Sequence, residues 1–236
     1  MEIKTYIFDV DGTLTPSRCK INKSFKEFFN TFCRKNVVWL VTGSDKVKTI
    51  EQIGEDTYNM CHTVYNCNGN DVWQSKKNIF TNDWILPDDA HEWLTEQLTS
   101  SSFKLRTGMH FEHRPGMCNF SIVGRNATKE ERAEYVFWDT KYKERDSLTY
   151  HFNILFPKLE AKVGGETGID IAPLGYDKSQ ITRDIQKNNI VYFFGDKMDP
   201  SGNDYPLKKK IFDNDLGFCY SVDGWKHTWE LLKNHE

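Results

Sequence analysis

The chain has 236 residues, of which 28% are charged, and its formal net charge is −3. This length suits one large domain, or a core with a second domain inserted into it. The charge shows none of the basic excess that nucleic-acid-binding proteins carry, so we expect no nucleic-acid partner. No apolar stretch approaches the ~20 residues that a membrane span needs, so we expect no membrane association.

The N-terminus and the cysteines indicate a cytoplasmic protein. The chain runs from Met1 directly into a strand-like segment that ends at Asp9, which leaves no room for a signal peptide. The 6 cysteines form no Cys-x-x-Cys pair and no cluster with zinc-ligand spacing. We therefore expect reduced, mostly buried thiols.

Short apolar runs that alternate with amphipathic segments predict an α/β core. The runs that resemble buried parallel strands are residues 5–8, 37–41, 64–65, 190–194 and 218–222. The spacing of Phe25, Phe28, Phe29 and Phe32 predicts one face of a helix. The spacing of Val47, Ile50 and Ile53 predicts a second helix, with Ser44 or Asp45 as its N-cap. A last short helix is predicted at 226–232. This alternation predicts a doubly wound, mostly parallel sheet.

The middle of the chain follows another pattern. Its predicted elements are a helix within 84–100, strands at 110–114 and 117–123, a helical region from a capping box at 128–131 to about 156, and strands at 160–163 and 169–172. Pro115-Gly116 between the first two strands is typical of a hairpin, which requires antiparallel strands. We therefore predict an α+β domain at 84–174, inserted into a core formed by 1–83 and 175–236.

Polar residues follow three of the predicted core strands. Asp9-Val10-Asp11-Gly12-Thr13 ends the first, Thr42-Gly43-Ser44 ends the second, and Gly195-Asp196 ends the fourth, with Asp204 close behind. Ligands of open parallel sheets bind at the carboxyl ends of the strands, so these segments should converge on one site.

The chemistry of these residues predicts phosphoryl transfer. Asp9 and Asp11 point the same way from an extended backbone, and with Asp196 and Asp204 they form an oxygen-rich cluster suited to Mg²⁺. Asp9 would attack phosphorus and Asp11 would act as general acid and base. Thr42 and Ser44 offer hydroxyls to the phosphate, and Lys178 or Lys197 could supply a cation. The alternatives are a polar strand-to-helix turn and solvated lysines.

At this point the sequence resembles a known family. Asp9-Val-Asp-Gly-Thr-Leu-Thr resembles the signature of the haloacid dehalogenase (HAD) superfamily, and nearly the whole chain is similar to eukaryotic-type phosphomannomutases. The wider similarity lies in residues 8–18, 114–125, 130–132 and 192–204. The spacing of Arg114, Arg125 and Arg132 is its most specific part.

The resemblance implies a core and a mobile cap that closes over a sugar phosphate. Asp9 would be the nucleophile and Asp11 the acid and base, while Asp196 would bind Mg²⁺ with Asp9 and the backbone at Asp11. The substrate would be held by Arg18, Arg114, Arg125, Arg132 and Asp170. Guanidinium groups suit the distal phosphate of a bisphosphate. The resemblance also implies a hexose 1,6-bisphosphate activator and a homodimer formed through the cap, for which Trp93, Leu94 and Phe111 could serve unless they belong to the cap core.

The expected activity is the interconversion of mannose 6-phosphate and mannose 1-phosphate, which feeds GDP-mannose synthesis. The alternative is a HAD-type sugar-phosphate phosphatase, which would share Asp9, Asp11 and Mg²⁺ and would admit water to the phospho-aspartate. A non-catalytic sugar-phosphate-binding relative is a third reading, against which the retained Asp9, Asp11 and Asp196 argue.

The chain departs from the family pattern at three places. The family carries a serine two residues before the sugar-binding aspartate, where this chain has Gly168, and the side chain of Thr167 should face the other side of the strand. The family's Glu-Asn-Gly after the third strand is Cys67-Asn68-Gly69 here. The loop after Asp204 contains Pro206 and a lysine run, so a second cation site that relatives form there is in doubt.

Overall fold

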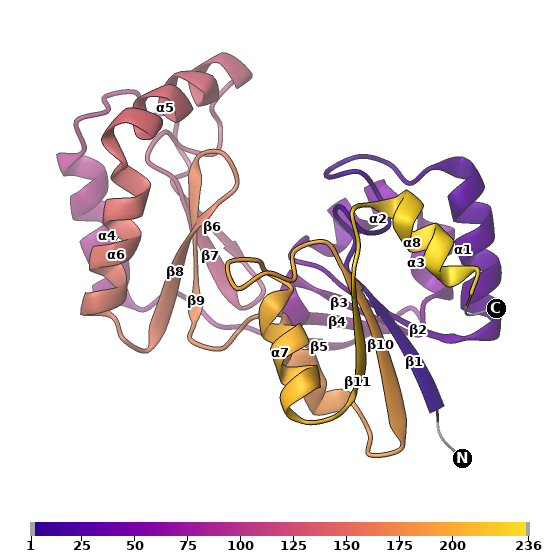
Figure 1. Ribbon diagram of the computed structural model, residues 1–236. Coiled ribbons are helices and arrows are strands. Elements are labelled where there is room, and N and C mark those ends of the chain that lie inside the picture. The colour runs from indigo at the N-terminus through magenta and orange to yellow at the C-terminus, as the bar shows by residue number, and fades with distance from the viewer. Residues whose placement is uncertain (1–2, 235–236) are drawn as a thin grey trace. The chain divides into compact units, whose positions relative to one another are not determined.

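The computed structural model describes residues 3–234, which form two compact units (Figure 1). The core unit comprises Met1–Thr81 and Gly175–Glu236, and the inserted unit comprises Asn82–Leu174. Each unit has its own sheet. None of the helices in the described part of the chain combines the length and the apolar character needed to cross a bilayer.

The core unit contains a seven-stranded sheet with the order β11-β10-β1-β2-β3-β4-β5. Its strands are β1 (Ile3–Phe8), β2 (Val37–Val41), β3 (Thr63–Asn66), β4 (Asp71–Gln74), β5 (Lys77–Thr81), β10 (Asn189–Gly195) and β11 (Gly217–Ser221). The pairings from β11 to β3 are parallel, and β4 and β5 are antiparallel. The predicted α/β class with a mostly parallel core sheet is confirmed. The strand order reverses between β1 and β10, which is where such sheets open a ligand crevice.

Helices cover both faces of this sheet (Figure 1). One face packs against α1 (Lys23–Lys35), α2 (Lys46–Ile53), α3 (Glu55–Met60) and α8 (Trp225–Leu232), and the other against the 3₁₀ helix η2 (Lys178–Asp184) and α7 (Tyr205–Asp213). Successive side chains of a strand point to opposite faces of the sheet, so each strand packs against the helices on both sides. Phe8 contacts the α1 side through Phe29, whereas Ile7 lies in the cluster of Leu207 and Ile211.

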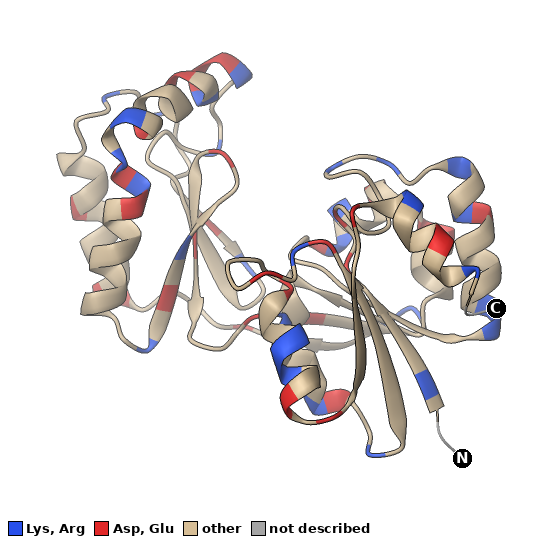
Figure 2. Cartoon of the chain, in the orientation of Figure 1, with Lys and Arg blue, Asp and Glu red and all other residues tan. Residues whose placement is uncertain are grey.

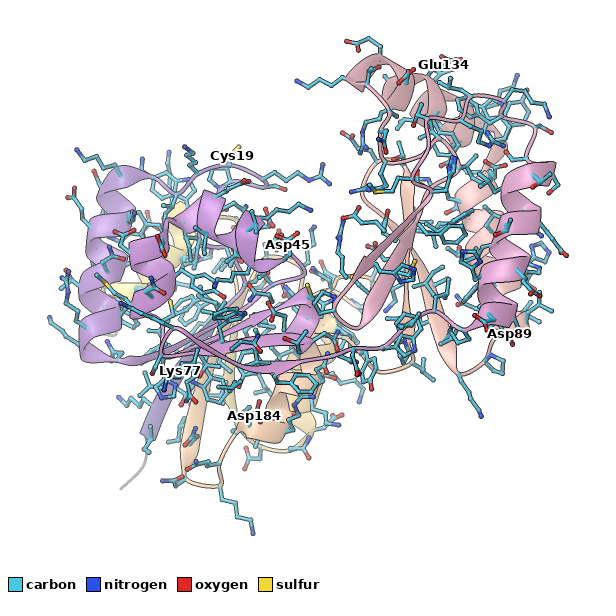
Figure 3. The ribbon with its side chains drawn as sticks, turned by 180° about the vertical axis from the view of Figure 1, so that it is seen from behind. Cys19, Asp45, Lys77, Asp89, Glu134 and Asp184 are labelled. Carbon is cyan, nitrogen blue, oxygen red and sulfur yellow. The ribbon has the colours of Figure 1, made fainter. Side chains whose placement is uncertain are left out.

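Local signals set the beginnings of the helices. Asn22 caps α1 by accepting a hydrogen bond from Phe25 N at 3.2 Å. Asp45, rather than Ser44, is the N-cap of α2, and it accepts from Lys48 N at 2.9 Å (Figure 3). The lysine run 208–210 lies on α7, where Figure 2 shows basic residues grouped along the ribbon.

The inserted unit contains a four-stranded antiparallel sheet with the order β6-β7-β9-β8. Its elements are α4 (Asp88–Ser100), β6 (Phe111–Arg114), β7 (Met117–Phe120), α5 (Lys129–Tyr142), α6 (Glu144–Leu155), β8 (Leu159–Gly164) and β9 (Gly168–Pro173). The expected capping box is present, because Glu131 N donates to Thr128 Oγ1 at 3.2 Å and Thr128 N donates to Glu131 Oε2 at 2.7 Å. Leu94 is buried in the core of this unit, and the partly buried Trp93 and Phe111 pack against that core.

The two faces of the inserted sheet differ in chemistry. Cys118, Phe120, Ile169 and Ile171 are buried in one apolar core with residues of α4 and α6. The strand register places Glu112, Asn119 and Asp170 opposite one another across β6, β7 and β9, on the other face. This face carries the polar side chains discussed below.

Two turns were not anticipated. The hairpin of β4 and β5 turns at Ser75 and Lys76, which have φ values of 47° and 68° without a glycine or asparagine. The helical region expected to run to about residue 156 is divided at Lys143, which has φ 56°. Residues other than glycine rarely adopt positive φ, so the sequence carried no signal for either turn. Among the cysteines, Cys33, Cys61, Cys67 and Cys118 are buried and Cys19 is exposed (Figure 3).

Candidate active site

Three carboxylates meet where β1 and β10 end. Asp9 directly follows β1, Asp196 directly follows β10, and Asp204 precedes α7. One oxygen from each lies within 4.8 Å of the others. Asp9 and Asp204 are 3% and 0% exposed, so their negative charges are removed from solvent and need compensation.

Lys178 supplies part of that compensation. Its Nζ donates to Asp9 Oδ1 at 2.5 Å and to Asp204 Oδ1 at 2.7 Å, and its side chain is completely buried. Asp177 caps η2 by accepting from Ser179 N at 2.8 Å and so fixes the turn that carries the lysine. Lys197 is exposed, and its backbone N donates to Asp204 Oδ2 at 3.1 Å.

The titration of the cluster reflects its burial. Burial raises the pKa of Asp9 to about 7, with the charge of Lys178 opposing this rise and that of Asp204 adding to it. Burial, and after it the charge of Asp204, also raises the pKa of Asp196. Burial alone would lower the pKa of Lys178, but the charges of Asp9 and Asp204 outweigh it and raise that pKa. The cluster therefore holds more negative charge than one ammonium group balances.

This donor set fits a divalent cation with oxygen ligands. Asp196 Oδ1 is buried and has no hydrogen-bond partner within residues 3–234. A buried carboxylate oxygen without a partner is costly unless a cation binds it. Asp9, Asp196 and Asp204 are the side chains that would hold Mg²⁺, a hard ion that prefers carboxylate oxygens.

Asp11 lies apart from these three side chains. Its Oδ1 accepts from Arg18 N at 2.6 Å and from Gln52 Nε2 at 2.8 Å. Gly12, which directly follows Asp11, has a φ of 78°, and a Cβ at this position would collide with the carboxylate of Asp196. Arg18 is exposed, and its own φ is 57°. Asp11 is thus held in place by two donors while remaining only partly buried.

The loop after β2 lies beside the loop after β1, because the two strands pair in parallel. Thr42 is buried, and its Oγ1 accepts from Ser44 N at 3.1 Å. The backbone oxygens of Thr42 and Ser44 accept from Asn68 N at 2.8 Å and Cys67 N at 2.9 Å. Cys67 and Asn68 therefore support the loop at Thr42 through their backbone N–H groups, although Cys67 stands where the family has glutamate.

A cavity of about 480 Å³ opens beside the carboxylates in the core unit. Its lining includes Gly12, Thr15, Asp196, Asp223 and Trp225. Asp196 is therefore reachable by a small molecule although Asp9 and Asp204 are almost completely buried.

The expected arginines of the inserted unit lie in ion pairs. Glu112 joins two of them, since its Oε1 pairs with Arg114 Nη2 at 2.8 Å and its Oε2 with Arg125 Nε at 2.5 Å. Burial alone would raise the pKa of Glu112, but these guanidinium groups hold it below its usual range. Arg132 pairs separately with Glu166 at 3.2 Å. The position of Glu112 shows that one anionic group can bind Arg114 and Arg125 together.

Asp170 has a partner that sequence reasoning missed. Asn119 Nδ2 donates to Asp170 Oδ1 at 2.6 Å. Thr167 is buried, and its Oγ1 has no hydrogen-bond partner in the described part of the chain. Gln52 and Glu112 were missed too. Glu112 could have been noticed, because it stands two residues from Arg114 in a predicted strand, whereas nothing in the sequence links Gln52 to Asp11.

Comparisons with known proteins give a consistent assignment. The family model described as eukaryotic phosphomannomutase matches residues 25–235. A phosphomannomutase of Saccharomyces cerevisiae is 29% identical, over 96% of this chain and 91% of that protein. Phosphomannomutase 1 of Dictyostelium discoideum is 31% identical, over 85% of each chain.

Solved structures show the same fold at low sequence identity. A haloacid dehalogenase-like hydrolase from Bacteroides thetaiotaomicron matches all of both chains with a TM-score of 0.64 and 14% identity. A trehalose-6-phosphate phosphatase related protein matches 98% of this chain and 96% of its own, with a TM-score of 0.60 and 13% identity. The fold is HAD-like, and the chain belongs to the eukaryotic phosphomannomutase family.

Proposed function

We propose that this protein is an active cytoplasmic phosphomannomutase that interconverts mannose 6-phosphate and mannose 1-phosphate and so feeds GDP-mannose synthesis. The observation that carries the proposal is the presence of two separate sets of groups that suit phosphate. The first is the Asp9 cluster with Lys178, and the second is the Arg114–Glu112–Arg125 arrangement. A mutase handles a bisphosphate and needs both sets, whereas hydrolysis of a monophosphate needs only the first.

The core unit would carry out the chemistry. A carboxylate oxygen of Asp9 attacks phosphorus, the bond from phosphorus to the sugar oxygen breaks, and Asp11 gives a proton to that oxygen. Lys178, which already contacts Asp9, offsets negative charge at the reacting centre. Mg²⁺ bound by Asp9, Asp196 and Asp204 would add positive charge against the phosphate oxygens. In the return step Asp11 takes the proton of the accepting hydroxyl, which attacks the aspartyl-phosphate.

The inserted unit would hold the phosphate that is not reacting. Guanidinium groups bind phosphate through paired N–H donors, and a phosphate dianion offers more acceptor oxygens than the carboxylate of Glu112. We expect it to displace Glu112 from Arg114 and Arg125, and Arg132 to contribute charge. Thr42 and Ser44 would bind the phosphate at Asp9, while Arg18 and Asp170 would bind the sugar.

Two further parts of the proposal rest on the family. A hexose 1,6-bisphosphate would prime the enzyme by phosphorylating Asp9, and two chains would associate through the inserted unit. The phosphatase alternative requires water at the phospho-aspartate, and the arginine set of the inserted unit argues for the mutase.

The direct test is a coupled assay on mannose 1-phosphate with Mg²⁺ and a trace of glucose 1,6-bisphosphate, in which mannose 6-phosphate and free phosphate are recorded together. We expect isomerisation that depends on the bisphosphate, with little free phosphate. Release of free phosphate without isomerisation would identify a phosphatase instead.

The Mg²⁺ site gives a pH-dependent prediction. In the metal-free protein Asp9 has a pKa of about 7, above its ordinary 3.8, so proton binding favours the folded state at low pH and this contribution is lost as the pH rises through 7. Mg²⁺ competes with that proton. The thermal unfolding midpoint should therefore rise more on Mg²⁺ addition at about pH 8 than at about pH 6. Asp196→Asn should lose most of the shift, and an equal shift at both pH values would contradict the assignment.

A substitution of Arg125 distinguishes the roles of the two proposed phosphate sites. Arg125→Ala should lower kcat/KM for isomerisation by ~10-fold or more, because a charge-assisted contact to the second phosphate is lost. Hydrolysis of p-nitrophenyl phosphate, which has one phosphate, should change by less than about twofold. Arg34→Ala, at an exposed position of α1, is the matched control. Equal losses in both reactions would mean that Arg125 does not hold the second phosphate.

A further inference from the structure

Gln52 is a polar side chain on the buried face of α2. The buried residues of this helix are Thr49, Gln52 and Ile53, and their spacing places them on one side of it. Gln52 is 8% exposed. An amide removed from water is costly unless it makes hydrogen bonds. The partners of the Gln52 amide therefore indicate what this side chain does.

Both partners of the amide lie in the segment that follows β1. Gln52 Nε2 donates to Asp11 Oδ1 at 2.8 Å and to Thr15 Oγ1 at 3.4 Å. The hydroxyl of Thr15 donates its own hydrogen to Val10 O at 3.3 Å, so its oxygen can only accept from Gln52. An ionised carboxylate also only accepts. Both contacts therefore require the amide nitrogen, which fixes the orientation of the Gln52 side chain.

The backbone of Gln52 holds the far end of the same segment. Ile21 N donates to Gln52 O at 2.8 Å. One residue of α2 therefore contacts the segment at Asp11 through its side chain and at Ile21 through its backbone. A substitution of the Gln52 side chain leaves the backbone contact possible, so it can release Asp11 without detaching the whole segment.

Two donors meet on one oxygen of Asp11. Gln52 Nε2 and Arg18 N both donate to Oδ1, and neither of them donates to Oδ2. A proton on Oδ1 would face the hydrogens of both donors, so a protonated Asp11 carries its proton on Oδ2. The two contacts thus give the oxygens different roles, with Oδ1 as the anchor and Oδ2 as the atom that can give or take a proton.

We propose that Gln52 is a positioning residue for the acid–base step, because its amide holds Asp11 Oδ1 and leaves Oδ2 to exchange a proton with the sugar oxygen. This inference rests on the proposed function for the role of Asp11. As Asp9 takes the phosphoryl group, the bond from phosphorus to the sugar oxygen breaks, its electron pair stays on that oxygen, and the proton of Oδ2 goes to it. In the return step Oδ2 takes the proton of the accepting hydroxyl. Gln52 acts through Asp11 and needs no contact with the substrate.

The test compares two phosphoryl donors that differ in their need for an acid. The oxygen of a sugar phosphate leaves with a proton, whereas p-nitrophenolate leaves as a stable anion and needs none. With Mg²⁺ present and the whole chain in excess over the donor, each measurement reports the first transfer to Asp9. Gln52→Met keeps the length of the side chain and removes its donor. It should slow transfer from glucose 1,6-bisphosphate by ~10-fold and leave the release of p-nitrophenolate within about twofold.

Two further variants separate positioning from a general structural effect. Glu51→Met, at an exposed position of the same helix, is the matched control and should change neither rate. Asp11→Asn should slow transfer from glucose 1,6-bisphosphate more than Gln52→Met does. The double variant of Asp11→Asn and Gln52→Met should be no slower than Asp11→Asn alone, because Gln52 acts through Asp11.

Three results would overturn the proposal. They are an unchanged rate from glucose 1,6-bisphosphate in Gln52→Met, equal losses for the two donors, and additive losses in the double variant. If Gln52→Met does not fold, Gln52→Glu decides the matter by the same comparison, because an ionised glutamate has the size of glutamine and no donor. If the unsubstituted protein takes no phosphoryl group from glucose 1,6-bisphosphate, the proposed mutase is refuted instead. Mannose 6-phosphate then serves as the sugar phosphate in the comparison that tests Gln52.

Discussion

The buried ion cluster around Lys178 is the constraint on which the candidate site depends. One ammonium group contacts Asp9 and Asp204 directly, and a third carboxylate, Asp196, keeps an oxygen without a partner. Removing charges from water is expensive unless they are paired and hydrogen-bonded. The described side chains leave an excess of negative charge here, and burial, together with the charge of Asp204, raises the pKa of Asp9. A cation at this site would complete the balance and keep Asp9 ionised as a nucleophile.

The fold brings this cluster together from distant parts of the sequence. Asp9 and Asp196 follow two neighbouring parallel strands whose chain order reverses between them. Lys178 comes just after Gly175, where the chain re-enters the core unit. The inserted unit lies between these segments in sequence. It holds Arg114 and Arg125 on Glu112, and it holds Asp170 through a hydrogen bond from Asn119.

Much of this arrangement could be predicted, and the rest could not, for physical reasons. Runs of apolar residues predicted the parallel strands, and their polar ends predicted the carboxylates, because strand ends converge at one edge of a sheet. The hairpin of β4 and β5 was missed, since Ser75 and Lys76 carry no turn signal. Partnerships over long sequence distances, such as Gln52 with Asp11, have no local pattern. The sequence showed that Gly168 lacks a side chain, but only the structure shows that the amide of Asn119 fills that space.

The central claim is that Asp9, held by Lys178, becomes phosphorylated. It is tested most directly by incubating the protein with Mg²⁺ and glucose 1,6-bisphosphate, quenching in acid and locating the phosphoryl group by peptide mass spectrometry. The account predicts one phosphoryl group on the peptide that contains Asp9, none in Asp9→Asn, and a strongly reduced amount in Lys178→Met. Phosphorylation of another residue, or an unchanged amount on Asp9 in Lys178→Met, would contradict it.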